Sequence, residues 1–585
     1  MKKKILSLLM AAVMLFGTGC QAVIDLNEET GDLKVNGIPL EELVNEGIQE
    51  LAGNQEEKTG DIQEPAGNQE EKTGDIVIVY TNDVHCSVDG DIGYAGVAAY
   101  RNEMAASGND VLLVDCGDSI QGGPIGTLTE GEAVVRIMNA AGYDIGVPGN
   151  HDFDYGAERM IDLFQKADFP FVCCNLIDLR TGERVFDPYR ILECGGKKIA
   201  FVGVTAPHTI TESAPVNFQD KDGKLLYDMM LDETPDRFYR AVQDAVDEAR
   251  QEGAELCILL SHLGINATYT RFLSVDVIRN TSGIDAVLDA HSHSVVEDER
   301  VKNKDGKEVL LTQTGSHLDR FGKLTIHPDG SMASSLVEES GEKDPEVEKT
   351  ISEEYAEFQT ILDQKIGTTD YNLMATTLDR KVDLVRNSET NLGDLAADAC
   401  RFASGAEIGL INGGGIRDNI LKGEITYGDL MQVYPFGNEI IMKKLTGQQI
   451  MDALEYSVSS APVEYGGFLQ VSGLTFDVDL DKDPQVQRDT EGMFTGFGSE
   501  ERRVSNIKVN GEDLDPEKTY LTASIEYLLG QCGNGYSMFT GEKEEMEGFL
   551  DDLSSLIRYL ESMGGKVSEE YADENGQGRI HFLQE

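Results

Sequence analysis

The sequence predicts two folded domains, the first of the α/β class and the second α/β or α+β. The chain has 585 residues, more than one ordinary domain holds, and 40% hydrophobic with 26% charged residues is the usual balance of a globular protein. From residue 76 onward, short apolar runs alternate with amphipathic stretches, the pattern of βαβ units around a largely buried sheet. Polar side chains directly follow several of these runs, so we expect a site at one edge of that sheet.

The net charge excludes one class of function. Lys and Arg number 49 against 105 Asp and Glu, which gives a formal charge of -56 at pH 7. A groove that tracks polymeric phosphate needs the opposite sign, so the sequence indicates no polymeric nucleic acid as a partner. A small anionic substrate must instead be held by metal ions or arginines whose local field overrides that of the whole chain.

Residues 1–20 have the features of a signal peptide. Lysines at positions 2 to 4 precede an apolar stretch, Ile5–Phe16, and small residues lead to Cys20. The 12 residues of that stretch are fewer than the roughly 20 that a membrane-spanning helix needs. The residues before Cys20 resemble a bacterial lipoprotein processing site, although Gly17 stands where an aliphatic residue is usual. We expect an extracytoplasmic protein tethered to the cell membrane by lipidation at Cys20, with plain secretion as the alternative.

Residues 21–75 are expected to form an acidic linker, which contains a direct repeat. The segment Ala52–Ile62 recurs as Ala66–Ile76. This polar composition offers too little apolar surface to stabilise a fold, and two copies are too few for a solenoid. We therefore expect a spacer. The apolar residues scattered over 26–50 leave a small local element open there.

The first domain, which we place at residues 76–337, contains seven strand candidates. They are Val77–Tyr80, Val111–Val114, Ile145–Val147, Phe171–Cys173, Ile199–Val204, Leu256–Leu260 and Ala286–Leu288. Residues of the types that bind metals follow five of them, namely Asp83, His85, Asp118, Asn150, His151, His262, His291 and His293. Open α/β sheets place their active sites at the carboxyl ends of the strands, so we expect these side chains to meet.

The spacing of these residues favours metal binding. In an extended Asp-x-His the two side chains point the same way, because the strand period is two, so Asp83 and His85 can bind one ion. His291 and His293 repeat that geometry, and Asp118 has two oxygens with which it can bridge two cations. Mixed oxygen and imidazole ligands suit Zn, Mn or Fe better than Mg or Ca alone. Each motif alone is often a coincidence, but five of the nine histidines lie in these motifs.

This series of motifs resembles the calcineurin-like metallophosphoesterase domain of the 5′-nucleotidase family, from residue 76 to about residue 335. The resemblance implies a βαβ sandwich that holds two divalent metal ions. It implies that His151, oriented by Asp154, is the catalytic histidine beside the metals. It also implies the ligands: Asp83, His85, Asp118 and His293 for one metal, and Asp118, Asn150, His262 and His291 for the other.

A linking helix and a second domain complete the chain. Residues 338–365 carry apolar side chains at helical spacing and predict the linking helix. The second domain, residues 366–585, is expected to close with a helix at Asp551–Met563 and a short strand at 579–583. Three of its segments resemble the C-terminal domain of the same family, and they contain Arg386, Asn412, Arg417 and Phe436.

The resemblance implies a substrate pocket in this second domain. Arg386 and Arg417 would neutralise or hydrogen-bond the substrate, Asn412 would contact the base, and Phe436 would stack on it. The match weakens near residue 530, because Asn534 stands where the family has an Asp on the ribose hydroxyls. Tyr527 reaches the second aromatic position only with one extra residue between. An amide still accepts a hydrogen bond but lacks the strength of a carboxylate, by about 1 kcal/mol when buried.

Together these features predict an extracellular two-metal phosphohydrolase that removes phosphate from nucleoside 5′-monophosphates by metal-activated water, with His151 and Asp154 assisting. UDP-sugars are a further candidate substrate. A 2′,3′-cyclic-nucleotide phosphodiesterase, a 3′-nucleotidase or another phosphomonoesterase on the same metals is the alternative, and the intact ligand set speaks against a non-catalytic adhesin. We expect a small-molecule nucleotide as substrate, membrane contact through the N-terminal lipid only, and a monomer or weak dimer.

Overall fold

The computed structural model describes residues 74–265, 272–489, 492–544 and 550–583, and the backbone of three short strands near the N-terminus. These strands pair antiparallel in chain order, so a small element does lie in the segment that the sequence left open: β1 (Ile24–Leu26), β2 (Leu33–Val35) and β3 (Ile38–Pro39). The predicted signal peptide, Cys20 and most of the linker lie outside the described residues. In the part that the structure describes, no helix has both the length and the apolar character to cross a membrane.

Two β-sheets form the centre of the first domain. One has the order β17-β16-β4-β5-β6 and the other the order β14-β15-β13-β12-β10-β9. The first sheet consists of β4 (Ile76–Thr81), β5 (Asp110–Asp115), β6 (Ile145–Gly146), β16 (Phe321–Ile326) and β17 (Met332–Val337). The second consists of β9 (Tyr189–Cys194), β10 (Lys197–Thr205), β12 (Leu256–His262), β13 (Ala286–Leu288), β14 (Val295–Lys302) and β15 (Glu308–Thr314). Strands β4 to β6, and strands β10, β12, β13 and β15, are parallel.

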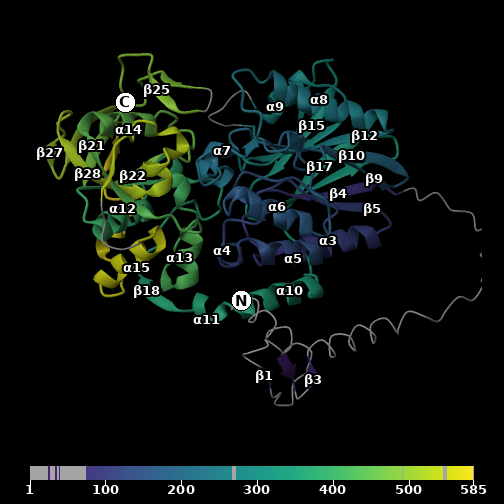
Figure 1. Ribbon diagram of the computed structural model, residues 1–585, viewed down its shortest axis with the longest axis horizontal. Coiled ribbons are helices and arrows are strands. Elements are labelled where there is room, and N and C mark those ends of the chain that lie inside the picture. Colours follow the sequence, from purple (N-terminus) through teal and green to yellow (C-terminus); the bar gives the residue numbers. More distant parts are fainter. Residues whose placement is uncertain are drawn as a thin grey trace, which may run out of the picture. The chain divides into compact units, whose positions relative to one another are not determined.

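The period-two alternation of the strands explains how the sheets are layered. On β4, Ile78 and Tyr80 belong to a core that also contains Phe201 and Ile258 of the second sheet, so the two sheets pack face to face. Val77 and Val79 point the other way, into a core shared with helices. Helices cover both outer faces (Figure 1): α3 (Gly93–Ala106), α5 (Glu132–Ala141) and α6 (Ala157–Lys166) on the first sheet, α8 (Asp236–Gln251) and α9 (Ser274–Asn280) on the second. The domain is therefore an α/β/β/α sandwich.

Six of the seven predicted strands are present. The candidate at Phe171–Cys173 was wrong as a strand, because its residues form only single bridges, Gly146 with Phe171 and Val172 with Asp187. The sequence analysis also missed β9, β14 and β17 at the sheet edges, and β15 and β16 inside the sheets. On the edge strand β14 most side chains are exposed, so no apolar run announces it.

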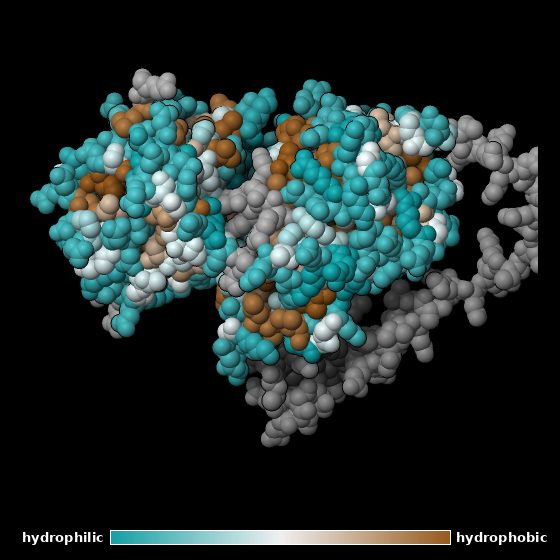
Figure 2. Space-filling view, turned by 90° about the horizontal axis from the view of Figure 1, so that it is seen from above, coloured by the Kyte–Doolittle hydropathy of each residue, from teal (hydrophilic) through white to brown (hydrophobic). Residues whose placement is uncertain are grey.

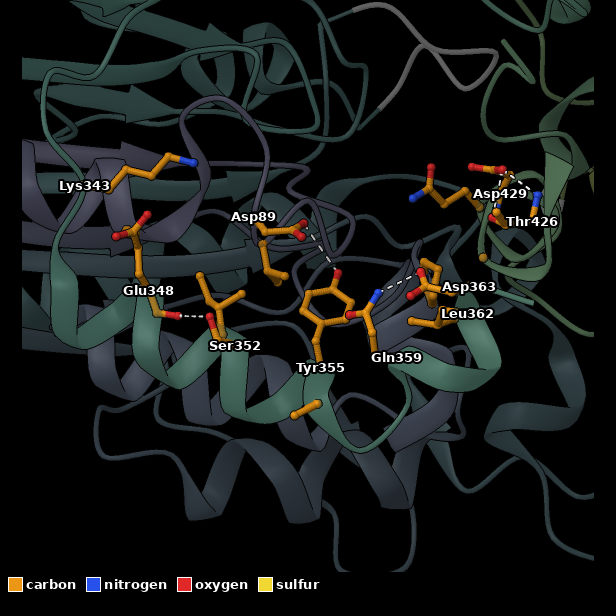
Figure 3. Close-up of a pocket in the computed structure, with 17 residues that line it drawn as sticks. Asp89, Lys343, Glu348, Ser352, Tyr355, Gln359, Leu362, Asp363, Thr426 and Asp429 are labelled. Carbon is orange, nitrogen blue, oxygen red and sulfur yellow. Dashed lines mark hydrogen bonds between the residues drawn. The ribbon is translucent and has the colours of Figure 1, made fainter. Parts of the chain in front are cut away.

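The predicted linking helix is two helices, α10 (Pro345–Ala356) and α11 (Gln359–Leu362). The side chain of Asp344 caps α10, accepting hydrogen bonds from the backbone N–H groups of Glu346 and Val347. Both helices line a groove together with α13 (Tyr427–Val433) of the second domain, with a volume of about 730 Å³. Tyr355 points across this groove toward Asp89 (Figure 3), with its hydroxyl 3.5 Å from Asp89 Oδ1.

The second domain is built around a five-stranded sheet in the order β22-β19-β28-β21-β29. Its strands are β19 (Ile408–Asn412), β21 (Ile440–Thr446), β22 (Leu469–Ser472), β28 (Thr519–Ile525) and β29 (Lys543–Glu544). One hydrophobic core joins this sheet to α12 (Asn391–Ser404), α14 (Gly447–Ser457) and α15 (Asp552–Ser562). Helix α15 and strand β30 (Ile580–Phe582) confirm the helix and closing strand predicted at the end of the chain.

Hydrophilic residues cover most of the described surface on the face shown in Figure 2, and hydrophobic residues lie there in separate patches. Leu179, with 48% of its area exposed, is one of the exposed apolar side chains of the first domain. Phe201, by contrast, is fully buried between the two sheets. The packing of the two sheets therefore depends on residues such as Phe201.

Replacing Phe201 by alanine should lower the free energy of unfolding of the first domain by about 3–5 kcal/mol, because it removes a buried ring and leaves a cavity. The measurement is urea denaturation followed by circular dichroism. Leu179→Ala is the matched control, since its side chain is half exposed and its loss should change little. Equal effects of the two substitutions would contradict the sandwich packing.

Candidate active site

The predicted strand-end residues meet at one edge of the sandwich. Strands β4, β5 and β6 end in one sheet, and strands β12 and β13 end in the other, and all of them run toward the same edge. Two groups of potential metal-ligand atoms result, and within each group all atoms lie within 4.8 Å of one another. The first is Asp83, His85 and His293, and the second is Asp83, Asp118 and His262.

Histidines of two different sheets face each other in the first group. His85 Nε2 lies 3.1 Å from His293 Nε2, and Asp83 Oδ1 lies 3.7 Å from the same atom of His293. His85 Nδ1 lies 3.1 Å from the carbonyl oxygen of Gln121, which can only accept, so Nδ1 carries the proton and Nε2 keeps its lone pair. A lone pair held this way, beside a second imidazole and a carboxylate, fits a divalent cation.

A second set of ligand atoms lies beside the first. Asn150 Oδ1 is 3.1 Å from His262 Nε2 and 2.8 Å from His291 Nδ1. Asp118 Oδ2 is 3.3 Å from His262 Nε2 and 3.8 Å from His85 Nε2, so its carboxylate reaches both sets. The carboxylate of Asp83 also reaches both sets, because its Oδ1 lies 3.7 Å from His293 Nε2 and 3.9 Å from His262 Nε2. The donors fit two cations with carboxylates between them.

The strand-period argument for Asp83-x-His85 was wrong. β4 ends at Thr81, and Asp83 and His85 have φ angles of 48° and 47°, in the left-handed region rather than the extended one. His291 and His293 likewise have φ angles of 75° and 51°. Such residues are strained by about 1–3 kcal/mol each, and they persist where the surroundings determine them. Here the N–H groups of Asp83 and His85 donate to the carbonyls of Gly117 and Asp118, so tight turns bring the ligands together.

Asp152 is a structural residue of the site that the sequence analysis did not single out. Its carboxylate is fully buried and accepts hydrogen bonds from four backbone N–H groups, at 2.8–3.0 Å, those of Asp118, Ser119, Ile120 and Gly149. Burial raises its pKa to about 6. Nothing in the sequence distinguishes Asp152 from Asp154, two positions on in the same motif. The structure shows that Asp152 ties the loop of Asp118 to the loop of Asn150.

Asp154 instead faces His151. Its Oδ2 lies 2.7 Å from His151 Nδ1, and its Oδ1 accepts a hydrogen bond from Ser213 Oγ at 2.6 Å. Burial favours the neutral ring of His151, but the carboxylates of Asp154 and Asp118 outweigh it and raise the pKa of His151. His151 Nδ1, which faces Asp154, therefore carries a proton, and Nε2 remains available for another partner.

All six predicted substrate residues line one cavity, of about 1280 Å³, together with Asn150, His151 and His291. Arg417 reaches the ligand cluster, with a guanidinium nitrogen 3.4 Å from His85 Nε2. Burial and the neighbouring Arg386 lower the pKa of Arg417 to about 10, so it stays charged at neutral pH. The Phe436 ring lies 5.7 Å from the ring of His151 and 5.7 Å from Arg417 Cζ.

The remaining substrate residues come from three places: the turn at Arg386, the end of β19, and the segment after β28. Asn412 ends β19, and its Nδ2 donates to Asn534 Oδ1 at 3.2 Å. Tyr527 follows β28 in a π-helical turn, with its hydroxyl 3.4 Å from the carbonyl oxygen of Thr211 in the first domain. Arg386 is held by Asp383, whose Oδ2 is 3.1 Å from its Nε. Sequence reasoning missed Tyr465, which donates to the Asn534 carbonyl at 2.6 Å.

Glu212 was also missed, although it lines the same cavity. It ends the short helix α7 (Thr209–Glu212), and its Oε2 is 3.5 Å from His291 Nε2. Burial raises its pKa to about 7. It belongs to none of the motifs that the sequence analysis recognised, so only the fold brings it to the site.

Two family models match the chain. The one described as calcineurin-like phosphoesterase matches residues 76–295, and the one described as 5′-nucleotidase, C-terminal domain, matches residues 365–541. They correspond to the two halves of the cavity: the first contains the ligand groups, and the second contains Arg386, Asn412, Arg417, Phe436, Tyr527 and Asn534.

Curated relatives agree with these matches. A trifunctional nucleotide phosphoesterase protein, YfkN, of Bacillus subtilis is 29% identical over 548 residues, covering 84% of this chain. A 5′-nucleotidase of Vibrio parahaemolyticus is 27% identical and covers 85% of this chain and 91% of its own. The chain spans only 34% of YfkN and 38% of the Bacillus subtilis endonuclease YhcR.

Solved structures show the same fold. The crystal structure of a 5′-nucleotidase precursor from Thermus thermophilus is 26% identical, with a TM-score of 0.74, and covers 87% of this chain and 100% of its own. A sulfate thiohydrolase, SoxB, from the same organism has a TM-score of 0.67 at 20% identity, and that likeness concerns the fold alone.

Replacing Asp152 by alanine should lower the free energy of unfolding by at least about 3 kcal/mol, because it leaves buried N–H groups without an acceptor. It should also weaken metal binding, since Asp118 and Asn150 lose their shared support. Chemical denaturation and metal content measure the two effects. The matched control is Asp162→Ala, a partly exposed carboxylate paired with Lys166, which should have little effect. Normal stability and metal content of the Asp152 variant would contradict this role.

Proposed function

The chain belongs to the 5′-nucleotidase family and is a phosphoric ester hydrolase, and from that premise we propose that it removes phosphate from nucleoside 5′-monophosphates. One observation carries the proposal: arginines and an aromatic ring of the second domain line the same cavity as His151 and the ligand atoms of the first. The arginines suit a phosphate and the ring suits a base. Metallophosphoesterases of this family use divalent metals.

We propose two divalent ions, Zn or Mn, in the two ligand sets. Asp83, His85 and His293 would hold one, Asn150, His262 and His291 the other, and Asp118 would bridge them, as its distances to His85 and His262 allow. Bound there, two ions supply positive charge that stabilises the phosphoryl group and activates the attacking water. Imidazole, amide and carboxylate donors together suit these ions better than Ca or Mg.

His151 is proposed to act on the leaving group. Water oxygen forms a bond to phosphorus while the bond to the nucleoside oxygen breaks, and that oxygen needs a proton. Asp154 accepts a hydrogen bond from Nδ1–H of His151, which leaves Nε2 to hydrogen-bond the phosphate or to give a proton to the leaving oxygen. Because Ser213 donates to the other oxygen of Asp154, the carboxylate keeps a fixed orientation.

The second domain is proposed to hold the rest of the nucleotide. Arg417 and Arg386 would neutralise the phosphate, since Arg417 already points at His85. Phe436 and Tyr527 would stack on the base and Asn412 would contact it. UDP-sugars are a second substrate class that a cavity of about 1280 Å³ has room for.

One observation favours a second candidate, a 2′,3′-cyclic-nucleotide phosphodiesterase or 3′-nucleotidase. Asn534 Oδ1 is already engaged by Asn412 Nδ2. That contact and the lack of charge make it a weaker acceptor for ribose hydroxyls than a carboxylate would be. A substrate whose 2′ or 3′ oxygen carries the phosphate has fewer free hydroxyls and depends less on this acceptor.

We also propose the parts of the chain and its location. Residues 1–20 are proposed as the signal peptide, 21–75 as the linker, 76–337 and 366–585 as the two domains, and 338–365 as the connection. An extracytoplasmic position with a lipid at Cys20 rests on the basic start, the short apolar stretch and the small residues before that cysteine. A monomer or weak dimer is expected.

The proposed reaction is tested by product analysis with the purified protein loaded with Mn or Zn. We expect AMP to be hydrolysed with a higher kcat/KM than UDP-glucose, 2′,3′-cyclic AMP or glycerol phosphate, because the base and the phosphate are both bound. Chromatography of the products measures each reaction. If only the cyclic nucleotide or glycerol phosphate reacts, the metal site stands and the proposed substrate is wrong.

His151→Ala should lower kcat by about 10²- to 10⁴-fold, because the leaving oxygen loses its proton donor, with metal content unchanged. Steady-state kinetics and metal analysis measure the two quantities. His327→Ala is the matched control, since that imidazole of the same domain is 43% exposed and pairs with Asp75 at the surface. A fully active His151 variant would end this assignment.

Asn534→Asp should raise kcat/KM for AMP about fivefold, equivalent to about 1 kcal/mol, because a carboxylate accepts from the ribose hydroxyls more strongly than an amide. Activity on 2′,3′-cyclic AMP should not rise. The control is Asn510→Asp, an exposed asparagine with nearly the same backbone angle, φ 51° against 53°. A decrease with AMP would show that Asn534 does not contact the ribose.

A further inference from the structure

The histidines of the candidate metal centre differ in how their second ring nitrogen is held. A histidine that gives one nitrogen to a cation carries its proton on the other, and that N–H needs an acceptor. For His85 the acceptor is the carbonyl of Gln121, at 3.1 Å from Nδ1, and for His262 it is the carbonyl of Cys116, at 2.7 Å from Nδ1. In both residues Nε2 is therefore the nitrogen that faces the ligand cluster.

His291 is oriented the opposite way. Its Nδ1 lies 2.8 Å from Asn150 Oδ1, which is itself 3.1 Å from His262 Nε2, so Nδ1 faces the cluster. When Nδ1 binds a cation, the ring proton belongs on Nε2, which points away from the cluster. The carboxylate of Glu212 lies on that side, with Oε2 at 3.5 Å.

Glu212 has an unused acceptor at this position. Its Oε2 is buried, and among the described residues it has no hydrogen-bond partner. A buried carboxylate oxygen without a donor is unfavourable by about 1–3 kcal/mol or more, so such an atom needs an explanation. The Nε2–H of His291 is the donor that Glu212 lacks, and Glu212 is the acceptor that His291 lacks.

We propose that Glu212 is a positioning residue for the metal centre: its carboxylate accepts a hydrogen bond from Nε2–H of His291 and so fixes the tautomer and orientation in which Nδ1 binds a divalent cation. This rests on the proposed two-metal function. Backbone carbonyls hold His85 and His262, and substitution cannot remove those. Glu212 is a side chain, so its support of His291 can be removed selectively.

The next residue supports a different part of the site. Ser213 Oγ donates to Asp154 Oδ1 at 2.6 Å, and Asp154 orients His151. Glu212 and Ser213 are therefore neighbours in the chain with separable roles, one toward a metal-binding histidine and one toward the catalytic pair. Substituting each in turn distinguishes loss of metal support from general disturbance of this loop.

The test is metal binding by the full-length chain, not activity. Metal-free protein is titrated with Mn²⁺, bound ions are counted by mass spectrometry, and both dissociation constants are measured by calorimetry. We expect two ions per chain in the unmodified protein. Glu212→Ala should weaken one of the two sites by about 10- to 100-fold and leave the other unchanged. Glu212→Gln, whose amide oxygen still accepts a hydrogen bond, should weaken it less.

Two controls accompany these variants. Ser213→Ala should bind both ions normally and show a lower kcat, and Glu342→Ala, an exposed glutamate, should behave as the unmodified protein. If Glu212→Ala does not fold, Glu212→Leu, which is similar in size and has no acceptor, decides. Normal affinity at both sites in the Glu212 variants would overturn the role of Glu212 alone. Fewer than two ions in the unmodified protein would overturn the proposed metal centre, and the role of Glu212 with it.

Discussion

The candidate site depends on the face-to-face packing of two sheets whose parallel strands end at the same edge. Asp83 and Asp118 follow strands of one sheet and His262 ends a strand of the other, yet their ligand atoms lie within 4.8 Å of one another. Each of the two sets of metal ligands contains residues from both sheets. The apolar layer formed by residues such as Ile78 and Phe201 thus fixes the distances between the polar ends.

That packing brings the carboxylates of Asp83 and Asp118 together in a buried site, and this shifts their pKa values. Burial and the nearby Asp118 raise the pKa of Asp83 to about 7, whereas His262 lowers the pKa of Asp118 against the effect of its own burial. Two buried carboxylates so close repel each other unless positive charge lies between them. Divalent cations would supply that charge. Asp152, with its four backbone N–H donors, stabilises the turns that the ligands require.

Much of the first domain and most of the site residues could be predicted from the sequence, because buried parallel strands are apolar runs and the polar residues after them stand out. The edge strand β14 could not be predicted, since most of its side chains are exposed and it lacks that run. The local geometry was wrong for Asp83 and His85, because left-handed turns depend on hydrogen bonds from loops distant in the sequence. Glu212 could not be found, since only the tertiary fold places it beside His291.

The central claim is that the chain holds two cations in the two ligand sets. Anomalous diffraction from crystals of the protein loaded with Mn or Zn tests it most directly. We predict two peaks about 3.5–4 Å apart, one beside His85 and His293 and one beside His262 and His291, with Asp118 between them. A single peak, or peaks away from these histidines, would contradict the account.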